Sequence, residues 1–206
     1  MNVTQQRILG KALEMFNLKG IEYVGMRELA AELGLRIGNL TYYFPTKDDL
    51  VYALTELYSA SNSEIHKAYP VKSLYDFLKK NEALFKNGLR YRSLLLSMVH
   101  LIERNPKIAA NYEGVRSARL AGLNGDTTVL AKNNYLKFKS EAEQLLLAST
   151  NSLQNRFWMS EAVLSGSRQE LDGQMNHYLS LKAFLFTPYA TQAGLNDIER
   201  FLQELQ

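Results

Sequence analysis

The sequence contains no cysteine, and only three histidines and four prolines occur in its 206 residues. Without cysteine, a disulfide framework, a thiol nucleophile and a cysteine-ligated metal are excluded. The histidines are scattered, and the motifs of metalloproteases, phosphate-binding loops and serine hydrolases do not occur. These absences argue against an enzyme, and we expect neither a cofactor nor a metal site.

Long apolar runs are also missing. The N-terminal segment MNVTQQRIL has no hydrophobic signal-peptide core, and no apolar stretch approaches the ~20 residues that span a bilayer. The lack of cysteine also fits a reducing compartment. We therefore expect a cytoplasmic protein that does not associate with a membrane.

Helical patterning, by contrast, is present almost throughout. Apolar residues recur at intervals of three and four, no segment alternates convincingly in the manner of a strand, and 46% of the residues are apolar. The expected fold class is all-α. We expect a small three-helix head at residues 1–47, followed by a larger helical body at residues 48–206.

Caps and breakers set the expected helix bounds. Thr4 is expected to cap the first helix and Gly20 to end it, while Thr46 and Asp49 form a capping-box-like start for a long helix that stops at Pro70. The segment LNGDTTV is expected to break the chain. The remaining helices are expected at about 74–87, 89–103, 108–123, 137–164 and 169–186, with a short last helix capped by Asn196 or Asp197.

The most informative segment, residues 26–50, reads MRELAAELGLRIGNLTYYFPTKDDL. Its first part has one apolar helical face and is ended by Gly34, and a second short helix begins near Arg36 and must stop before Pro45. The residues expected to face inward are Leu29, Ala30, Leu33, Leu35, Leu40 and Phe44. Two short helices joined by a glycine turn are typical of a helix-turn-helix DNA reader.

An α-helix fits the major groove, where base edges can be read. Arg36 and Asn39 are the best candidates, because arginine binds guanine and asparagine binds adenine through paired hydrogen bonds. Ile37 suits a thymine methyl group, and Gly38 allows close backbone approach. Tyr42 is expected to pack between helices. Phosphate contacts are expected around the helix start near Met26 and Arg27, and from Thr41, Tyr43 and Lys47.

The charge of the head is balanced. Residues 1–55 carry six basic and six acidic side chains, although no acidic side chain lies between Arg36 and Lys47. A balanced head predicts modest non-specific affinity and specificity that rests on base contacts. It also leaves an alternative function open, a helical adaptor that binds proteins and not DNA.

Several fixed offsets over almost fifty residues carry a family resemblance. They are Arg7, Ile8, Leu9, Ala12, Phe16, Gly20, Leu29, Ala30, Gly34, Leu40, Tyr42, Phe44, Lys47 and Leu50. Over roughly its first quarter, the chain resembles the heads of tetracycline-repressor-type (TetR family) transcriptional regulators. It departs from the family pattern at Thr41, where tyrosine is usual, and at Gly25 and Met26, where a threonine is common.

The resemblance implies a ligand-responsive regulator, usually a repressor, that binds double-stranded DNA as a homodimer on a pseudopalindrome. Dimerisation is expected through late helices at about 140–187, with stripes at Ala142, Leu145, Leu146, Ser149, Leu153, Phe157 and Ala162, and at Met175, Tyr178, Leu179, Lys182, Ala183 and Phe186. A small-molecule effector is expected in the body. Its candidate contacts, which suit an ordinary core equally well, are Tyr91, Met98, His100, Tyr112, Arg116, Asn155 and Trp158.

Overall fold

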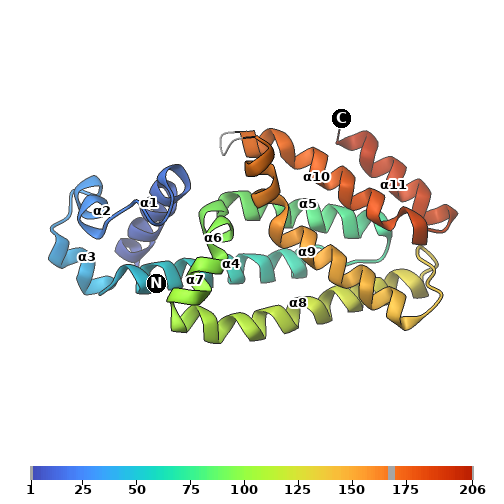
Figure 1. Ribbon diagram of the computed structural model, residues 1–206, viewed down its shortest axis with the longest axis horizontal. Coiled ribbons are helices and arrows are strands. Elements are labelled where there is room, and N and C mark those ends of the chain that lie inside the picture. The colour runs from blue at the N-terminus through green and yellow to red at the C-terminus, as the bar shows by residue number, and fades with distance from the viewer. Residues whose placement is uncertain (1, 167–169, 206) are drawn as a thin grey trace. The chain divides into compact units, whose positions relative to one another are not determined.

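The computed structural model describes residues 2–166 and 170–205, which are helical nearly throughout (Figure 1). This confirms the all-α class, and in the described ranges the one β-bridge, Leu136 with Ala190, is isolated. None of the described helices is both long and apolar enough to cross a membrane. The elements are α1 (Val3–Lys19), α2 (Met26–Glu32), α3 (Ile37–Tyr43), α4 (Lys47–Ala68), α5 (Leu74–Arg90), α6 (Arg92–Leu96), α7 (Met98–Arg104), α8 (Pro106–Lys132), α9 (Glu141–Ser165), α10 (Leu171–Phe186), the short 3-10 helix η2 (Thr187–Tyr189) and α11 (Gln192–Glu204).

Packing divides the chain into two compact units. The N-terminal unit comprises residues 1–61 and 90–113, and the C-terminal unit comprises residues 62–89 and 114–206. Helices α4 and α8 contribute residues to both units. The expected functional boundary after residue 47 stays a prediction.

In the N-terminal unit, α1 to α4 share one apolar core. Ile8 and Phe16 of α1, Leu40 of α3 and Leu50 of α4 are almost completely buried in it. The guanidinium of Arg7 fastens α1 to the end of α2, because it donates a hydrogen bond of 2.6 Å to the carbonyl of Leu33. The first cap differs from expectation: Asn2, not Thr4, caps α1 through a reciprocal pair of hydrogen bonds with Gln5.

The turn between α2 and α3 has the geometry that the sequence predicts. Gly34 adopts a φ of +65°, a left-handed conformation in which glycine avoids the strain of a side chain. Its N–H donates to Ala31, and the N–H of Leu35 donates to Ala30, so both bonds of a Schellman motif are formed. This turn sets the direction of α3.

The capping box at the start of α4 is also confirmed. Asp49 accepts hydrogen bonds from the backbone and hydroxyl of Thr46, and the Thr46 hydroxyl accepts from the N–H of Asp49 at 3.1 Å. The ammonium of Lys107, on α8, lies 2.6 Å from the same carboxylate. This ammonium, together with Thr46, holds the pKa of Asp49 below its usual value.

The prediction of a single helix at residues 89–103 is wrong. Breaks at Tyr91 and Ser97 divide this segment among the end of α5, α6 and α7. At the first break, the amide of Asn17 donates to the carbonyl of Arg90 at 2.8 Å and accepts from the N–H of Ser93 at 3.1 Å. A side chain of α1 therefore satisfies backbone groups that a continuous helix would have paired.

The break expected at LNGDTTV is also wrong, since α8 runs without interruption through these residues. Leu123, Thr127 and Leu130 are buried on one side of α8. Each glycine costs a helix about 1 kcal/mol relative to alanine, and burial of this face offsets that cost.

The last helices begin at other residues than expected. Ser140 caps α9, which starts at Glu141, and Thr191 caps α11, so Gly194 lies inside a helix. A Cβ at Gly194 would lie 2.4 Å from the carbonyl oxygen of Tyr135, which explains why only glycine fits there. Asp197 instead accepts a hydrogen bond from Tyr75 at the start of α5. The start expected for α10 at Gln169 lies outside the described residues.

The C-terminal unit packs α5, α9 and α10 around aromatic side chains. The rings of Phe77 and Phe186 meet edge to face, and those of Phe85 and Trp158 stack in parallel with centroids 4.7 Å apart. This core also encloses polar groups, among them Lys182 and Asn151.

Candidate nucleic-acid interface

Helix α3 presents the four residues predicted to read bases. Arg36, the residue that precedes the helix, and Ile37, Gly38 and Asn39 in its first turn are all exposed. Leu40, the next residue of the helix, is completely buried. The buried leucine holds α3 against the core, and the four residues before it are accessible at the start of the helix.

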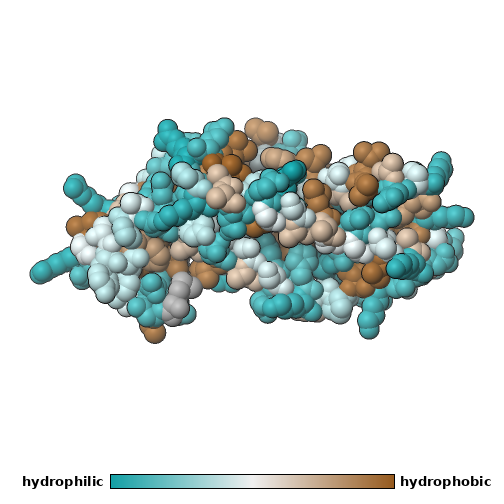
Figure 2. All heavy atoms as spheres, turned by 90° about the horizontal axis from the view of Figure 1, so that it is seen from below, coloured by the Kyte–Doolittle hydropathy of each residue, from teal (hydrophilic) through white to brown (hydrophobic). Residues whose placement is uncertain are grey.

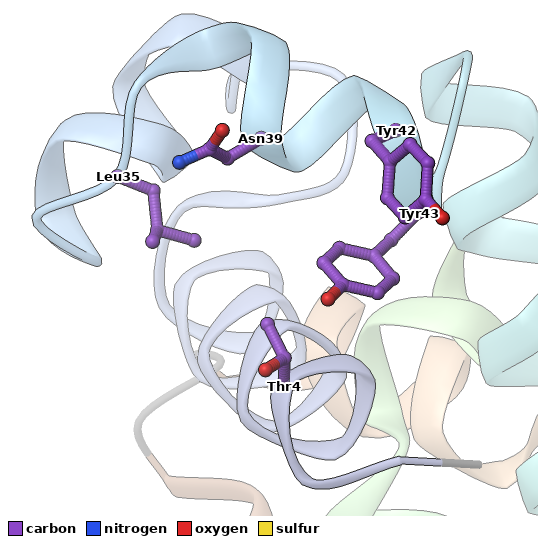
Figure 3. Close-up of a pocket in the computed structure, with 5 residues that line it drawn as sticks. All are labelled: Thr4, Leu35, Asn39, Tyr42 and Tyr43. Atoms are coloured by element: carbon purple, nitrogen blue, oxygen red, sulfur yellow. The ribbon is translucent and has the colours of Figure 1, made fainter.

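Two neighbouring tyrosines at the end of α3 have different environments. Tyr42 was expected to pack between helices, but this is wrong, because 81% of it is exposed. Tyr43 is partly buried against the core of the N-terminal unit, and Figure 3 shows its ring directed toward α1, where Thr4 lies. The two rings meet edge to face at 5.1 Å. Sequence reasoning thus missed Tyr42 as a surface residue of this helix.

A shallow hollow lies beside the outer face of α3 (Figure 3). It has a volume of about 190 Å³ and is lined by Thr4, Leu35, Asn39, Tyr42 and Tyr43. Small-molecule pockets usually enclose roughly 300–1,000 Å³. The hollow is therefore too small for a typical effector site, and we regard it as a shallow depression in the surface beside α3.

Two predicted phosphate contacts have polar atoms that are already engaged. The hydroxyl of Thr41 donates to the backbone carbonyl of Ile37 at 3.1 Å. The ammonium of Lys47 donates to the carbonyl of Glu22 at 3.4 Å and lies 5.9 Å from the ring centroid of Phe16. Burial there lowers the pKa of Lys47. Both groups would have to leave these contacts to donate to a phosphate.

The start of α2 supplies the other two predicted positions. Met26 packs partly against the core, whereas Arg27 is exposed. Gly25 precedes the helix and provides no side-chain cap. Of the charged residues predicted to contact DNA, Arg27 and Arg36 are thus the two on the surface.

The seven predicted effector contacts do not gather in one place. Four belong to the N-terminal unit, where Tyr91 is buried against Tyr58 and His100 is exposed; the others there are Met98 and Tyr112. Arg116 is an exposed residue of the C-terminal unit. The structure brings only Asn155 and Trp158 together, one helical turn apart on the inner side of α9.

The predicted dimer stripes are exposed on α9 but not on α10. Exposed residues of α9 are Ala142, Leu145, Leu146, Ser149, Leu153 and Phe157, whereas Ala162 is buried. On α10 the residues Tyr178, Leu179, Lys182, Ala183 and Phe186 are buried in the unit's own core, and Met175 is half-buried. The exposed side of α10 carries His177, Leu181 and Phe184 instead. Figure 2 shows hydrophobic residues reaching the surface in several patches on one face of the molecule.

Known families match both parts of the chain. A family described as "Bacterial regulatory proteins, tetR family" matches residues 8–54, and one described as "Bacterial transcriptional repressor" matches residues 52–198. A comparison with curated proteins finds no match.

Solved structures show the same fold. A TetR-family transcriptional regulator from Marinobacter aquaeolei VT8 is 22% identical, with each chain covered over 100% of its length and a TM-score of 0.88. The TetR-family protein CprB from S. coelicolor A3(2) is 17% identical over 99% of this chain and 96% of its own, with a TM-score of 0.69. A putative regulator from Saccharomonospora viridis, solved in complex with choline, is 18% identical over 84% of this chain and 96% of its own, with a TM-score of 0.65.

The second family match alone covers more than half of the chain, and the first covers α2 and α3 and ends within α4. The exposure of residues 36–39 at the start of α3 agrees with that assignment. The chain is a DNA-binding transcriptional regulator rather than an enzyme, and it belongs to the TetR family, whose members are typically ligand-responsive repressors.

Proposed function

We propose that this regulator acts in the cytoplasm as a homodimer, reads a pseudopalindromic duplex with α3 and releases it when an effector binds the body. The observation that carries the proposal is the exposure of Arg36 and Asn39 at the start of a helix that the buried Leu40 anchors to the core. The sequence left open a helical adaptor that does not bind DNA. Membership of a family of DNA-binding regulators argues against that alternative.

Within this face, Arg36 and Asn39 supply sequence readout. A guanidinium that pairs with guanine, or an amide that pairs with adenine, discriminates against the wrong base by ~1–3 kcal/mol. Tyr42 extends the same face, and its exposed hydroxyl suits a phosphate oxygen. Arg27, exposed on the neighbouring helix α2, adds a positive charge for the backbone.

The homodimer rests on the apolar surface of α9 and α10, which pack against each other. Leu146 of α9 and Phe184 of α10 are 69% and 71% exposed. Other exposed apolar residues of these helices are Leu145, Leu153, Phe157, Leu164 and Leu181. A surface of this kind marks an interaction site, and a two-fold axis pairs it with itself. A dimer also explains how one short reading helix achieves useful specificity.

The effector site belongs to the interior of the body. Support comes from the S. viridis structure, in which a protein of this fold is in complex with choline. In this chain, the half-buried Asn155 and the buried Trp158 are the predicted contacts that lie together, one helical turn apart on α9. The dimer is proposed to have two arrangements of its heads, one that fits the operator and one that does not. An effector that binds one arrangement more tightly shifts the populations of the two and so changes operator affinity.

Selection from a random pool of duplex DNA tests the proposal. The purified protein is expected to enrich a sequence with two inverted half-sites at low and at moderate salt. Arg36→Ala is expected to abolish enrichment, whereas Lys67→Ala, which removes an exposed positive charge in the last turn of α4, is expected to retain it. Failure of the unaltered protein to retain any duplex at low salt would refute the DNA-binding role.

A further inference from the structure

Lys182 is a completely buried cationic side chain in the middle of α10. Its ammonium donates a hydrogen bond to the Asn151 side-chain oxygen on α9, and it lies 5.3 Å from the ring centroid of Phe85 on α5. An ammonium has three hydrogens to donate, and the amide accepts one. The surrounding helices thus satisfy only part of the hydrogen-bonding capacity of the Lys182 ammonium.

No opposite charge among the described residues compensates this lysine. Lys80, the other buried lysine described in this unit, is paired with Asp126 at 2.5 Å, whereas the groups facing Lys182 are an amide and a ring. Burial alone lowers the pKa of Lys182, to about 7. A buried ammonium without a counter-ion is costly, and an anion beside it removes that cost.

A second polar group in the same core lacks a partner. The side-chain oxygen of Asn155 is buried without a hydrogen-bond donor. Asn155 follows Asn151 by four residues on α9, so the two amides are neighbours on one face of that helix. Its own amide nitrogen reaches only the oxygen of Asn81, at 3.5 Å. This orphan acceptor needs a hydrogen-bond donor, which a hydroxyl group on a ligand's body could supply, whereas the uncompensated cation beside it needs an anion.

Aromatic rings enclose these groups. Trp158 stacks in parallel on Phe85 and also contacts Tyr178, with ring centroids 5.4 Å apart. Phe85 is also the ring that lies against the ammonium. An apolar or aromatic ligand body bound next to the cation would contact these rings.

From this arrangement we propose that the core around Lys182, Asn155 and Trp158 binds a small organic carboxylate with an apolar or aromatic body. The carboxylate accepts hydrogen bonds from the Lys182 ammonium. The proposal that this anion is the effector rests on the proposed function, whereas the anion site itself does not.

Trp158 is the single tryptophan of the sequence, so its fluorescence reports on this core directly. The probes are benzoate, phenylacetate, hexanoate and octanoate, each compared with its uncharged amide. At least one carboxylate is expected to change the emission saturably and to bind roughly 10- to 100-fold more tightly than its amide. Lys182→Met is expected to abolish this preference. Lys132→Met, which removes an exposed positive charge at the end of α8, is expected to keep it.

The inference is overturned if none of the four carboxylates gives a saturable change, or if Lys182→Met keeps the preference for the anion. If Lys182→Met does not give the helical circular-dichroism spectrum of the unaltered protein, Lys182→Gln decides in its place. Retention of a selected duplex, measured without probe, separates the two proposals. A protein that binds duplex but no carboxylate retains the proposed function and loses this inference, and one that binds carboxylate but no duplex does the reverse.

Discussion

At the scale of single residues, the outer face of α3 is defined by which polar atoms are already engaged. Arg36 and Asn39 are exposed, whereas the hydroxyl of Thr41 donates back to its own helix and the ammonium of Lys47 contacts Glu22 and Phe16. Reading a base requires donors and acceptors that are free to turn toward it. Arg36 and Asn39 meet that condition.

The two tyrosines at the end of α3 are expected to separate stability from DNA binding. Tyr43→Ala removes a ring that packs against the core and should lower the free energy of unfolding by about 1–3 kcal/mol. Tyr42→Ala removes a ring that is 81% exposed and should change it by less than about 0.5 kcal/mol. Urea unfolding measures both variants. Equal losses of stability would show that the two environments are not distinct.

The lowered pKa of Lys182 should make the free energy of unfolding depend on pH. Its folded pKa, about 7, is below the ordinary 10.5, so between these values the folded chain has released a proton that the unfolded chain holds. The free energy of unfolding should therefore rise with pH above about 7, by up to ~1.4 kcal/mol per unit. Below about pH 7 both states are charged, and this lysine contributes no pH dependence.

Urea unfolding of the unaltered protein and of Lys182→Met, at a fixed protein concentration from pH 6 to about pH 9, isolates this contribution. The variant is expected to be the more stable at low pH, and the difference is expected to shrink as pH rises. A difference that stays constant over this range would contradict the buried, readily neutralised lysine.

Part of the reading surface follows from the sequence at this scale, and part does not. Spacing alone predicts that Leu40 faces inward and that Asn39 faces outward, because helix period fixes relative direction. The partial burial of Lys47 and the exposure of Tyr42 depend on how other segments of the chain pack around them. No local pattern contains that information.

At the scale of elements, the turn between α2 and α3 determines where the reading helix points. Gly34 supplies the left-handed conformation, and Gly38, inside α3, is surrounded by open space. These two glycines therefore have different roles, one in the backbone of the turn and one on the surface of the reading helix.

Alanine at the two positions should have opposite effects on stability. Gly34→Ala should destabilise by about 1–2 kcal/mol, because a side chain at φ +65° is strained although nothing lies within 4 Å of it. Gly38→Ala should stabilise by about 0.5–1 kcal/mol, because alanine is the better helix former, while its methyl group weakens operator binding. Thermal unfolding and fluorescence anisotropy on a selected duplex measure the pair. Destabilisation by both variants would contradict the assignment of Gly38 to a regular helix.

Local signals predict elements well where they are strong. Gly20, Gly34 and the Thr46–Asp49 box end or begin helices as expected, because each acts within one turn of itself. The break at Tyr91 depends on Asn17, more than seventy residues away, and the continuity of α8 through Gly122 and Gly125 depends on the buried face of that helix. Tertiary contacts decide such cases, and the sequence does not show them.

At the scale of the whole molecule, the proposed function requires a second copy of the chain. The C-terminal unit exposes apolar residues on two packed helices, and a monomer gains nothing from that exposure. The family assignment places the reading helix in a DNA-binding head. Two such heads on a two-fold axis match inverted half-sites.

An acidic residue introduced on the exposed apolar surface of α9 or α10 should dissociate the proposed dimer. Leu146→Glu and Phe184→Glu are each expected to shift the protein from dimer to monomer in sedimentation-velocity experiments, because a carboxylate would be buried at the interface. Leu18→Glu, a matched change at a residue that is 75% exposed on α1, is expected to leave the dimer intact. Dimers that persist in both test variants would place the interface elsewhere.

The most direct test of the central claim is the affinity of the dimer for a selected duplex, measured by fluorescence anisotropy. Two chains are expected to bind each duplex, and scrambling one half-site should remove most of the affinity. Arg36→Ala and Asn39→Ala should each raise Kd by roughly 5- to 150-fold, corresponding to ~1–3 kcal/mol, while Lys67→Ala leaves it unchanged. If Arg36→Ala and Asn39→Ala both bind as tightly and as selectively as the unaltered protein, α3 is not the reading helix.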